Sequence, residues 1–136
     1  MRITVCRKAH FNAAHRLYNP AWDAEKNKAT FGKCSNPLYH GHNYDLEVYI
    51  TGEVDPLTGF VVDTKWLGVL IAEHVETYLD HKNLNEEVSE FKTMNPTAEH
   101  IAFVIYNRLR PHVSEAHDLE IKLFETARNF VIYRGE

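Results

Sequence analysis

Only two cysteines, Cys6 and Cys34, occur among the 136 residues, one in a strand-like segment and the other in a loop. Two such residues do not make the disulfide framework that stabilises small secreted domains, and free thiols are typical of a reducing compartment. We therefore expect a cytoplasmic protein. With 44% hydrophobic residues, the chain has enough apolar side chains to build a sizeable core without disulfides.

The sequence also lacks an excess of positive charge and any long hydrophobic run. Its 15 basic and 19 acidic residues give a net charge of −4, which leaves no electrostatic footprint for nucleic acid or an anionic membrane. No apolar stretch is long enough to cross a bilayer, and Met1 leads directly into a strand-like segment without a signal peptide. We expect one domain over residues 1–136 without a nucleic-acid or membrane partner, and this composition still leaves room for local basic pockets that bind an anionic small molecule.

The pattern of apolar residues predicts six main elements in the order β-β-α-α-β-β. These are strands at 3–15 and 42–52, helices at 63–79 and 95–111, and strands at 119–126 and 129–133. A short extended piece is expected at 60–62, a polar loop at 80–85, and a long irregular connection at 18–39, which in a compact domain is usually functional. Strands grouped on both sides of two helices indicate an α+β domain, in which helices cover one face of an antiparallel sheet.

Three histidines extend the apolar faces of the predicted strands. The apolar residues of the first strand hold odd positions, as His15 does, and those of the second hold even positions, as His40 and His42 do. Residues two apart on a strand point to the same side, so His40 and His42 can bind one ion together. Imidazole is a preferred ligand of Zn²⁺, and three protein ligands leave a fourth position open, as in catalytic sites. Glu125 continues the apolar row of the third strand toward the same side.

Several other residues allow more than one reading. Cys34 lies in the loop before His40, where it could act as a base, close a structural four-ligand zinc site, or simply be buried as a small apolar residue. Asp80 and His81 follow the first predicted helix and form either an acid/base pair or a cap of the helix C-terminus. Glu125 could instead pair with a basic neighbour at the surface.

Several segments together resemble the 6-pyruvoyl-tetrahydropterin synthase family, which has 6-carboxytetrahydropterin synthase as a relative. The matching segments, which span nearly the whole chain, are FNAAHRL (11–17), FGKCSNP (31–37), HGHNY (40–44), LDHKNL (79–84), TAE (97–99) and ET (125–126) with Asn129. His-Gly-His alone is a weak signal, whereas the whole set is specific.

The resemblance implies a tunnelling fold (T-fold), a four-stranded antiparallel sheet with two helices on one side. It also implies a homohexamer of two stacked three-subunit barrels, with active sites at the subunit interfaces. The implied site residues are His15, His40 and His42 as ligands of one zinc ion per subunit, Cys34 as general base, Asp80 and His81 as a proton relay that a neighbouring subunit can supply, Glu125 as anchor of the pterin ring, and Thr97 as a pterin contact.

The activity implied by the resemblance is that of a carbon–oxygen lyase of tetrahydrobiopterin biosynthesis. It converts 7,8-dihydroneopterin triphosphate to 6-pyruvoyl-tetrahydropterin with loss of triphosphate, to which Mg²⁺ could bind. The alternative is 6-carboxy-5,6,7,8-tetrahydropterin synthase of queuosine biosynthesis, which uses the same substrate and releases acetaldehyde; the five residues between Cys34 and His40 favour the pyruvoyl type. A non-catalytic zinc or pterin-binding module is a third reading, whereas a His-x-His hydrolase of the (β/α)₈ barrel type does not fit in 136 residues.

The sequence departs from the family pattern at a few positions. Asn12 replaces a frequent serine, Leu38-Tyr39 stands where Asn-Gly is common, and Ala98 replaces a frequent threonine. None of these is an implied zinc ligand or the implied base. We therefore expect the departures to affect substrate preference more than catalysis.

Overall fold

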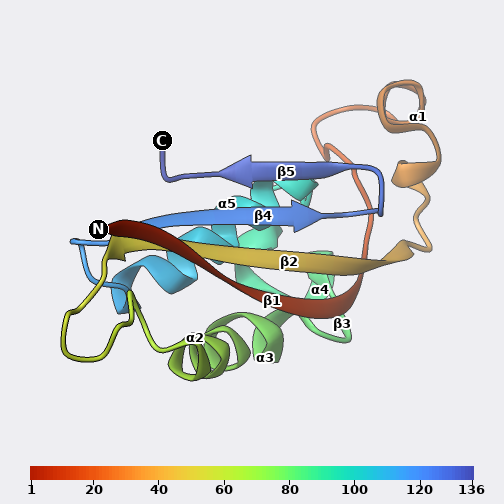
Figure 1. Ribbon diagram of the computed structural model, residues 1–136. Coiled ribbons are helices and arrows are strands. Elements are labelled where there is room, and N and C mark those ends of the chain that lie inside the picture. Colours follow the sequence, from red (N-terminus) through yellow and green to blue (C-terminus); the bar gives the residue numbers. More distant parts are fainter.

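Two long antiparallel strands, β1 (Arg2–His15) and β2 (His40–Glu53), form the centre of the fold (Figure 1). The computed structural model describes residues 1–136. Beyond β2 lie β4 (Asp118–Phe124) and then β5 (Phe130–Tyr133), each antiparallel to its neighbour. The strand β3 (Lys82–Asn83) pairs in parallel with β1, which gives the sheet order β3-β1-β2-β4-β5. The four predicted antiparallel strands are confirmed, and the sheet has one short additional strand at its edge.

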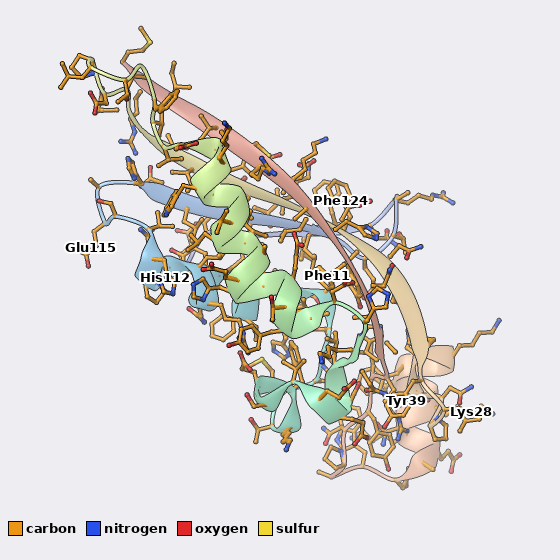
Figure 2. All side chains as sticks on the ribbon, turned by 90° about the horizontal axis from the view of Figure 1, so that it is seen from below. Phe11, Lys28, Tyr39, His112, Glu115 and Phe124 are labelled. Atoms are coloured by element: carbon orange, nitrogen blue, oxygen red, sulfur yellow. The ribbon has the colours of Figure 1, made fainter.

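The first predicted helix is confirmed as a continuous helical segment in three parts. These are α2 (Thr64–Ile71), a π-helical turn η2 (Ala72–Glu76) and α3 (Thr77–Leu79). Asp63 is the N-cap, and its carboxylate accepts the backbone N–H of Lys65 at 2.8 Å. Figure 2 shows this helix running alongside β1, and its buried side chains, Leu67, Leu70, Ile71 and Val75, belong to the core.

The second predicted helix is α5 (Ala98–Leu109), which ends in the 3₁₀ turn η4 (Arg110–His112). Thr97 is its N-cap, and the Thr97 hydroxyl accepts the backbone N–H of His100 at 3.3 Å. Both helices therefore cover the same face of the sheet and enclose the core between the two layers (Figure 1).

Burial alternates along the strands with the predicted parity. Odd positions of β1, even positions of β2 and odd positions of β4 are buried, namely Phe11, Ala13 and His15, then Tyr44, Leu46, Val48 and Ile50, then Leu119, Ile121 and Leu123. Each large aliphatic side chain removed from water in this way contributes about 1.5–3 kcal/mol. His15 thus lies at the end of a row of core residues, as expected.

Three segments differ from the prediction. The connection at 18–39 contains a helix, α1 (Ala24–Phe31), and a 3₁₀ turn, η1 (Gly32–Ser35). The polar loop expected at 80–85 contains β3 and the start of α4 (Leu84–Glu87), after which η3 (Ser89–Lys92) follows. Residues 60–62, expected to be extended, form a bend that leads into α2. These short elements carry too few apolar residues to produce a periodic pattern.

The α1 segment is organised around a buried polar residue instead of an apolar stripe. Asn27 is 1% exposed and is the single buried residue of the helix. Its Oδ1 accepts the N–H of Asn19 at 2.7 Å, while its Nδ2 donates to the carbonyls of Asn19 and Asp23, both at 3.0 Å. The Asn27 amide thereby ties the chain entering α1 to the first turn of the helix.

Replacing Asn27 by alanine should therefore lower the free energy of unfolding by about 2 kcal/mol, because it leaves buried backbone groups without partners. The neighbouring Lys28 is exposed, and Lys28→Ala should change the stability by less than about 0.5 kcal/mol. Urea denaturation of both variants measures the difference. Equal stability of the two variants would contradict this role of Asn27.

Candidate active site

Three imidazoles converge where β1 ends and β2 begins. His15 and His40 are directly paired across the two strands, and His42 is opposite Ala13. The ring centre of His15 lies 4.6 Å from that of His40 and 5.1 Å from that of His42. The ring centres of His40 and His42 are 4.9 Å apart. One nitrogen from each ring falls within 4.8 Å of the others, which is a spacing that one metal ion can bridge. The predicted clustering of the three histidines is confirmed.

Four ring nitrogens of the three histidines are buried without a hydrogen-bond partner in the protein. These buried atoms are Nε2 of His15, both ring nitrogens of His40, and Nε2 of His42. Buried polar atoms are normally paired, and leaving them unpaired is costly. A bound cation would satisfy one lone pair from each ring. The donor set therefore fits a metal ion that prefers imidazole nitrogen.

The second nitrogen of His15 fixes the orientation of its ring. We assign the His15 Nδ1–H as the donor to the carbonyl oxygen of Pro96, at 2.7 Å, which leaves Nε2 with its lone pair facing the other rings. Tyr44 approaches the same Nδ1 at 3.5 Å. Burial, followed by the proximity of His40 and His42, lowers the pKa of His15 to about 4 although the Pro96 bond opposes the shift. Burial, followed by His42, also lowers the pKa of His40, so both rings favour the neutral, metal-binding form.

A carboxylate and a cleft adjoin the three histidines. Glu125 has one oxygen 4.0 Å from Nε2 of His15 and the other 3.9 Å from Nε2 of His42. Glu125 and Thr97, the two residues expected to contact a pterin, both line a cleft of about 410 Å³ that Leu17 and Asn129 also border. Because Pro96 precedes Thr97, the same turn at the start of α5 touches both the cleft and His15.

Cys34 lies in η1, and two hydrogen bonds attach its segment to the end of β1. Its carbonyl accepts the N–H of Leu17 at 2.7 Å, and the next carbonyl, of Ser35, accepts Nη2 of Arg16 at 2.8 Å. The side chain is half-buried. Cys34 is not part of the group of converging metal-binding atoms, which consists of the three imidazoles. This geometry disfavours the closed site in which Cys34 would be a fourth ligand.

Asp80 and His81 form a pair on the far edge of β1. Asp80 accepts the backbone N–H of Asn12 at 2.9 Å and holds His81 Nδ1 at 2.9 Å, and the carbonyl of Asn12 accepts the N–H of His81 at 2.6 Å. The Asn12 hydrogen bond, followed by the contact with His81, lowers the pKa of Asp80. The His81 side chain is 77% exposed, and no hydrogen bond or ion pair joins the pair to the three histidines of its own chain.

Known proteins resemble this chain over nearly its whole length. A family model described as 6-pyruvoyl tetrahydropterin synthase matches residues 4–136. A 6-pyruvoyl tetrahydrobiopterin synthase of Pongo abelii is 41% identical over 132 residues, which cover 97% of this chain and 91% of the relative. The chain belongs to the 6-pyruvoyl tetrahydropterin synthase family. The expectation of that family is thereby confirmed.

The solved structures confirm the T-fold as well. The structure of Caenorhabditis elegans 6-pyruvoyl tetrahydropterin synthase superposes with a TM-score of 0.94 and 36% identity, covering 100% of this chain and 97% of that one. A more distant member, dihydroneopterin monophosphate aldolase of Pyrococcus furiosus, is 31% identical over 113 residues, which are 83% of this chain and 80% of the relative. Family membership makes the chain an enzyme, a lyase of the 6-pyruvoyl tetrahydropterin synthase type. No helix is both long and apolar enough to span a membrane.

Some groups at the candidate site could not be predicted from the types of side chain in the sequence. Pro96 and Asn12 contribute through backbone atoms, which every residue type possesses. Asn85 binds the residue that follows β1 through two hydrogen bonds. Its Oδ1 accepts the N–H of Arg16 at 2.9 Å, and its Nδ2 donates to the Arg16 carbonyl at 3.0 Å. An asparagine in a polar loop gives no sequence signal for such a role.

The lowered pKa of His15 predicts how the metal-free protein responds to acid. An unfolded histidine titrates near 6.5 and native His15 near 4, so between these values the unfolded state binds the additional proton. The free energy of unfolding should therefore fall by up to about 3 kcal/mol as the pH drops from 6.5 to 4. Urea denaturation in the presence of a chelator, at several pH values, measures this slope.

The slope should be smaller in His15→Gln, which lacks the buried ring, than in the wild type. Identical slopes in the wild type and His15→Gln would show that His15 is not the group responsible.

Proposed function

We propose that the chain is a zinc-dependent 6-pyruvoyl-tetrahydropterin synthase, which converts 7,8-dihydroneopterin triphosphate to 6-pyruvoyl-tetrahydropterin and triphosphate. The observation that carries the proposal is the convergence of three imidazoles, each with an unpaired nitrogen, beside a cleft lined by Glu125 and Thr97. The name of the 41% identical relative from Pongo abelii supports the pyruvoyl product over the carboxy product.

His15, His40 and His42 would hold the zinc ion. When bound, zinc supplies a Lewis acid that polarises the side-chain hydroxyls of the substrate and acidifies the neighbouring C–H bonds. The role of the protein is to hold the rings in the form and orientation that bind a metal. Burial lowers the pKa of His15 and His40, and the hydrogen bond to Pro96 orients the His15 ring.

Proton transfer would fall to side chains that do not bind the metal. The Cys34 thiolate would remove a carbon-bound proton from the substrate side chain, and its loop is held beside the end of β1 by the bonds of Leu17 and Arg16. His81 would return protons through Nε2, since Asp80 holds its other nitrogen, Nδ1, at 2.9 Å. Loss of triphosphate with internal redox tautomerisation requires no external oxidant or reductant.

Glu125 and Thr97 would hold the pterin ring. A carboxylate accepts two parallel hydrogen bonds from a ring N–H and an adjacent amine, which is the edge that a pterin presents. Glu125 lies in the turn after β4, where its own N–H donates to the Asn129 carbonyl at 3.2 Å, so the turn is internally fixed. Thr97 lies across the same cleft at the start of α5.

The complete site would be shared between subunits of a cytoplasmic homohexamer, a dimer of trimers. The exposed position of His81, without contact to the histidines of its own chain, fits a role in the site of a neighbouring copy. Both outer strands, β3 and β5, have an unpaired edge within one chain, where neighbouring copies could pair to close a barrel.

The decisive assay is incubation of the zinc-loaded protein with 7,8-dihydroneopterin triphosphate, with and without Mg²⁺, and identification of the product by mass. We expect 6-pyruvoyl-tetrahydropterin and free triphosphate. Release of acetaldehyde would instead identify the 6-carboxytetrahydropterin synthase reaction. A parallel reaction with dihydroneopterin monophosphate tests the activity for which the Pyrococcus furiosus relative is named. Zinc binding without turnover of either compound would indicate a non-catalytic binding module and would overturn the proposal.

Complementation tests the shared site. Cys34→Ala and His81→Ala should each reduce turnover at least a hundredfold while zinc remains bound, because neither side chain belongs to the group of metal-binding imidazoles. Hexamers reassembled from a mixture of the two variants should regain part of the activity, since some sites then combine an intact Cys34 with an intact His81 from another copy.

Mixing each variant with itself is the control and should restore nothing. If the mixed hexamers stay inactive although mass spectrometry shows that subunits have exchanged, Cys34 and His81 act within one chain. Normal turnover of Cys34→Ala would show that another group is the base.

A further inference from the structure

Tyr39 is held in an unusual backbone conformation directly beside the metal site. Its φ angle is 69°, in the left-handed region, and apart from His81 no other non-glycine residue has a positive φ. This conformation is strained for a bulky residue, whereas glycine adopts it freely. Tyr39 immediately precedes His40 and closes the loop that contains Cys34. Figure 2 shows Tyr39 at the end of the sheet where β2 begins.

The phenol of Tyr39 makes one specific bond that a glycine could not make. It donates to Oε1 of Glu86, which lies in α4, 47 residues further along the chain. The Glu86 carboxylate raises the pKa of Tyr39, so the phenol keeps the proton that it donates. A hydrogen bond to a charged group is among the stronger kinds, so it can hold a loop in a strained conformation.

The acceptor belongs to a short element that is bonded to three segments that carry site residues. Asn83, which caps α4, accepts the N–H of Glu86 at 3.3 Å and follows His81 by two residues. Asn85 binds both backbone groups of Arg16, next to His15. Glu86 binds Tyr39, next to His40. Thus α4 connects the Asp80–His81 segment, the end of β1 and the Cys34–His40 loop.

We propose that Tyr39 is a positioning residue, whose bond to Glu86 fixes the Cys34–His40 loop against α4 and thereby places the Cys34 thiol at the metal site. The loop has few other attachments to the rest of the chain. The Asn36 carbonyl and side chain bind only the N–H groups of Tyr39 and Leu38 within the loop, and the Leu38 side chain is 87% exposed. The Tyr39–Glu86 bond is the side-chain attachment just before His40, whereas the Leu17–Cys34 and Arg16–Ser35 bonds attach the cysteine end. The inference uses the proposed function only for its turnover readout.

Removal of the Tyr39 hydroxyl should impair the chemical step more than substrate binding, because Tyr39 does not line the cleft of Glu125 and Thr97. Tyr39→Phe should lower kcat about tenfold and change KM less than twofold. Glu86→Ala should have the same effect, and the double variant should be no worse than either single variant, since both remove one bond. Tyr78→Phe is the matched control, because its phenol is 48% exposed and makes no hydrogen bond, and it should keep the wild-type kcat.

The variant Tyr39→Gly distinguishes the effect of losing the phenol from the effect of the backbone strain. It relieves the left-handed strain, so its thermal midpoint should not lie below that of Tyr39→Phe, yet its kcat should be equally low. A wild-type kcat for Tyr39→Gly would show that the phenol has no positioning role.

A second measurement does not depend on turnover. Alkylation of zinc-loaded protein by iodoacetamide, resolved by peptide mass, should label Cys34 several-fold faster in Tyr39→Phe, while the exposed Cys6 serves as an internal reference with an unchanged rate. Equal Cys34 rates in the wild type and Tyr39→Phe, or multiplicative losses of kcat in the double variant, would overturn the inference. Absence of synthase activity in the wild type would refute the proposed function alone, because the alkylation rates still test the role of Tyr39.

Discussion

The register of β1 against β2 is the constraint on which the site depends. It places His15 directly opposite His40 and Ala13 opposite His42, so the three imidazoles meet at the strand ends. A shift of one residue would turn every side chain of one strand to the opposite face. The core prevents that shift, because it would expose residues such as Leu46 and Val48, which are fully buried. The apolar residues that stabilise the sheet therefore also hold the metal-binding geometry.

This dependence explains why so much of the fold and of the metal site could be predicted. Period-two burial determines which side of a strand each histidine faces, and His15, His40 and His42 follow the parity of their strands. The α1 segment could not be predicted, because a buried polar residue, Asn27, holds it in place of an apolar stripe. Likewise β3 has two residues, which is too short for any periodic pattern. Periodicity reports packing, and these segments are held by hydrogen bonds.

The same distinction applies to the residues around the metal site. Parity brings Glu125 to within 4.0 Å of His15, although it lies just beyond the end of β4, because the alternation continues for one more residue. Parity says nothing about Asp80 and His81, which are attached to the edge of β1 through the backbone of Asn12. Their role as a proton relay is part of the proposed function, and in the structure this pair makes no hydrogen bond or ion pair with the three histidines of its own chain. A residue pattern in one chain cannot reveal a site shared between two chains, which is the arrangement that we propose.

The two non-glycine residues with positive φ, Tyr39 and His81, both lie in segments that carry site residues. The backbone strain at each residue is offset by a hydrogen bond to a different part of the chain, from Tyr39 to Glu86 and from His81 to Asn12. Strain of this kind persists only where the surrounding contacts determine the conformation. Because α4 follows His81 closely and also binds Tyr39, a displacement of one segment would be transmitted to the other. If neighbouring subunits share their sites, α4 would then couple the Cys34 loop of one site to the histidine that serves the next.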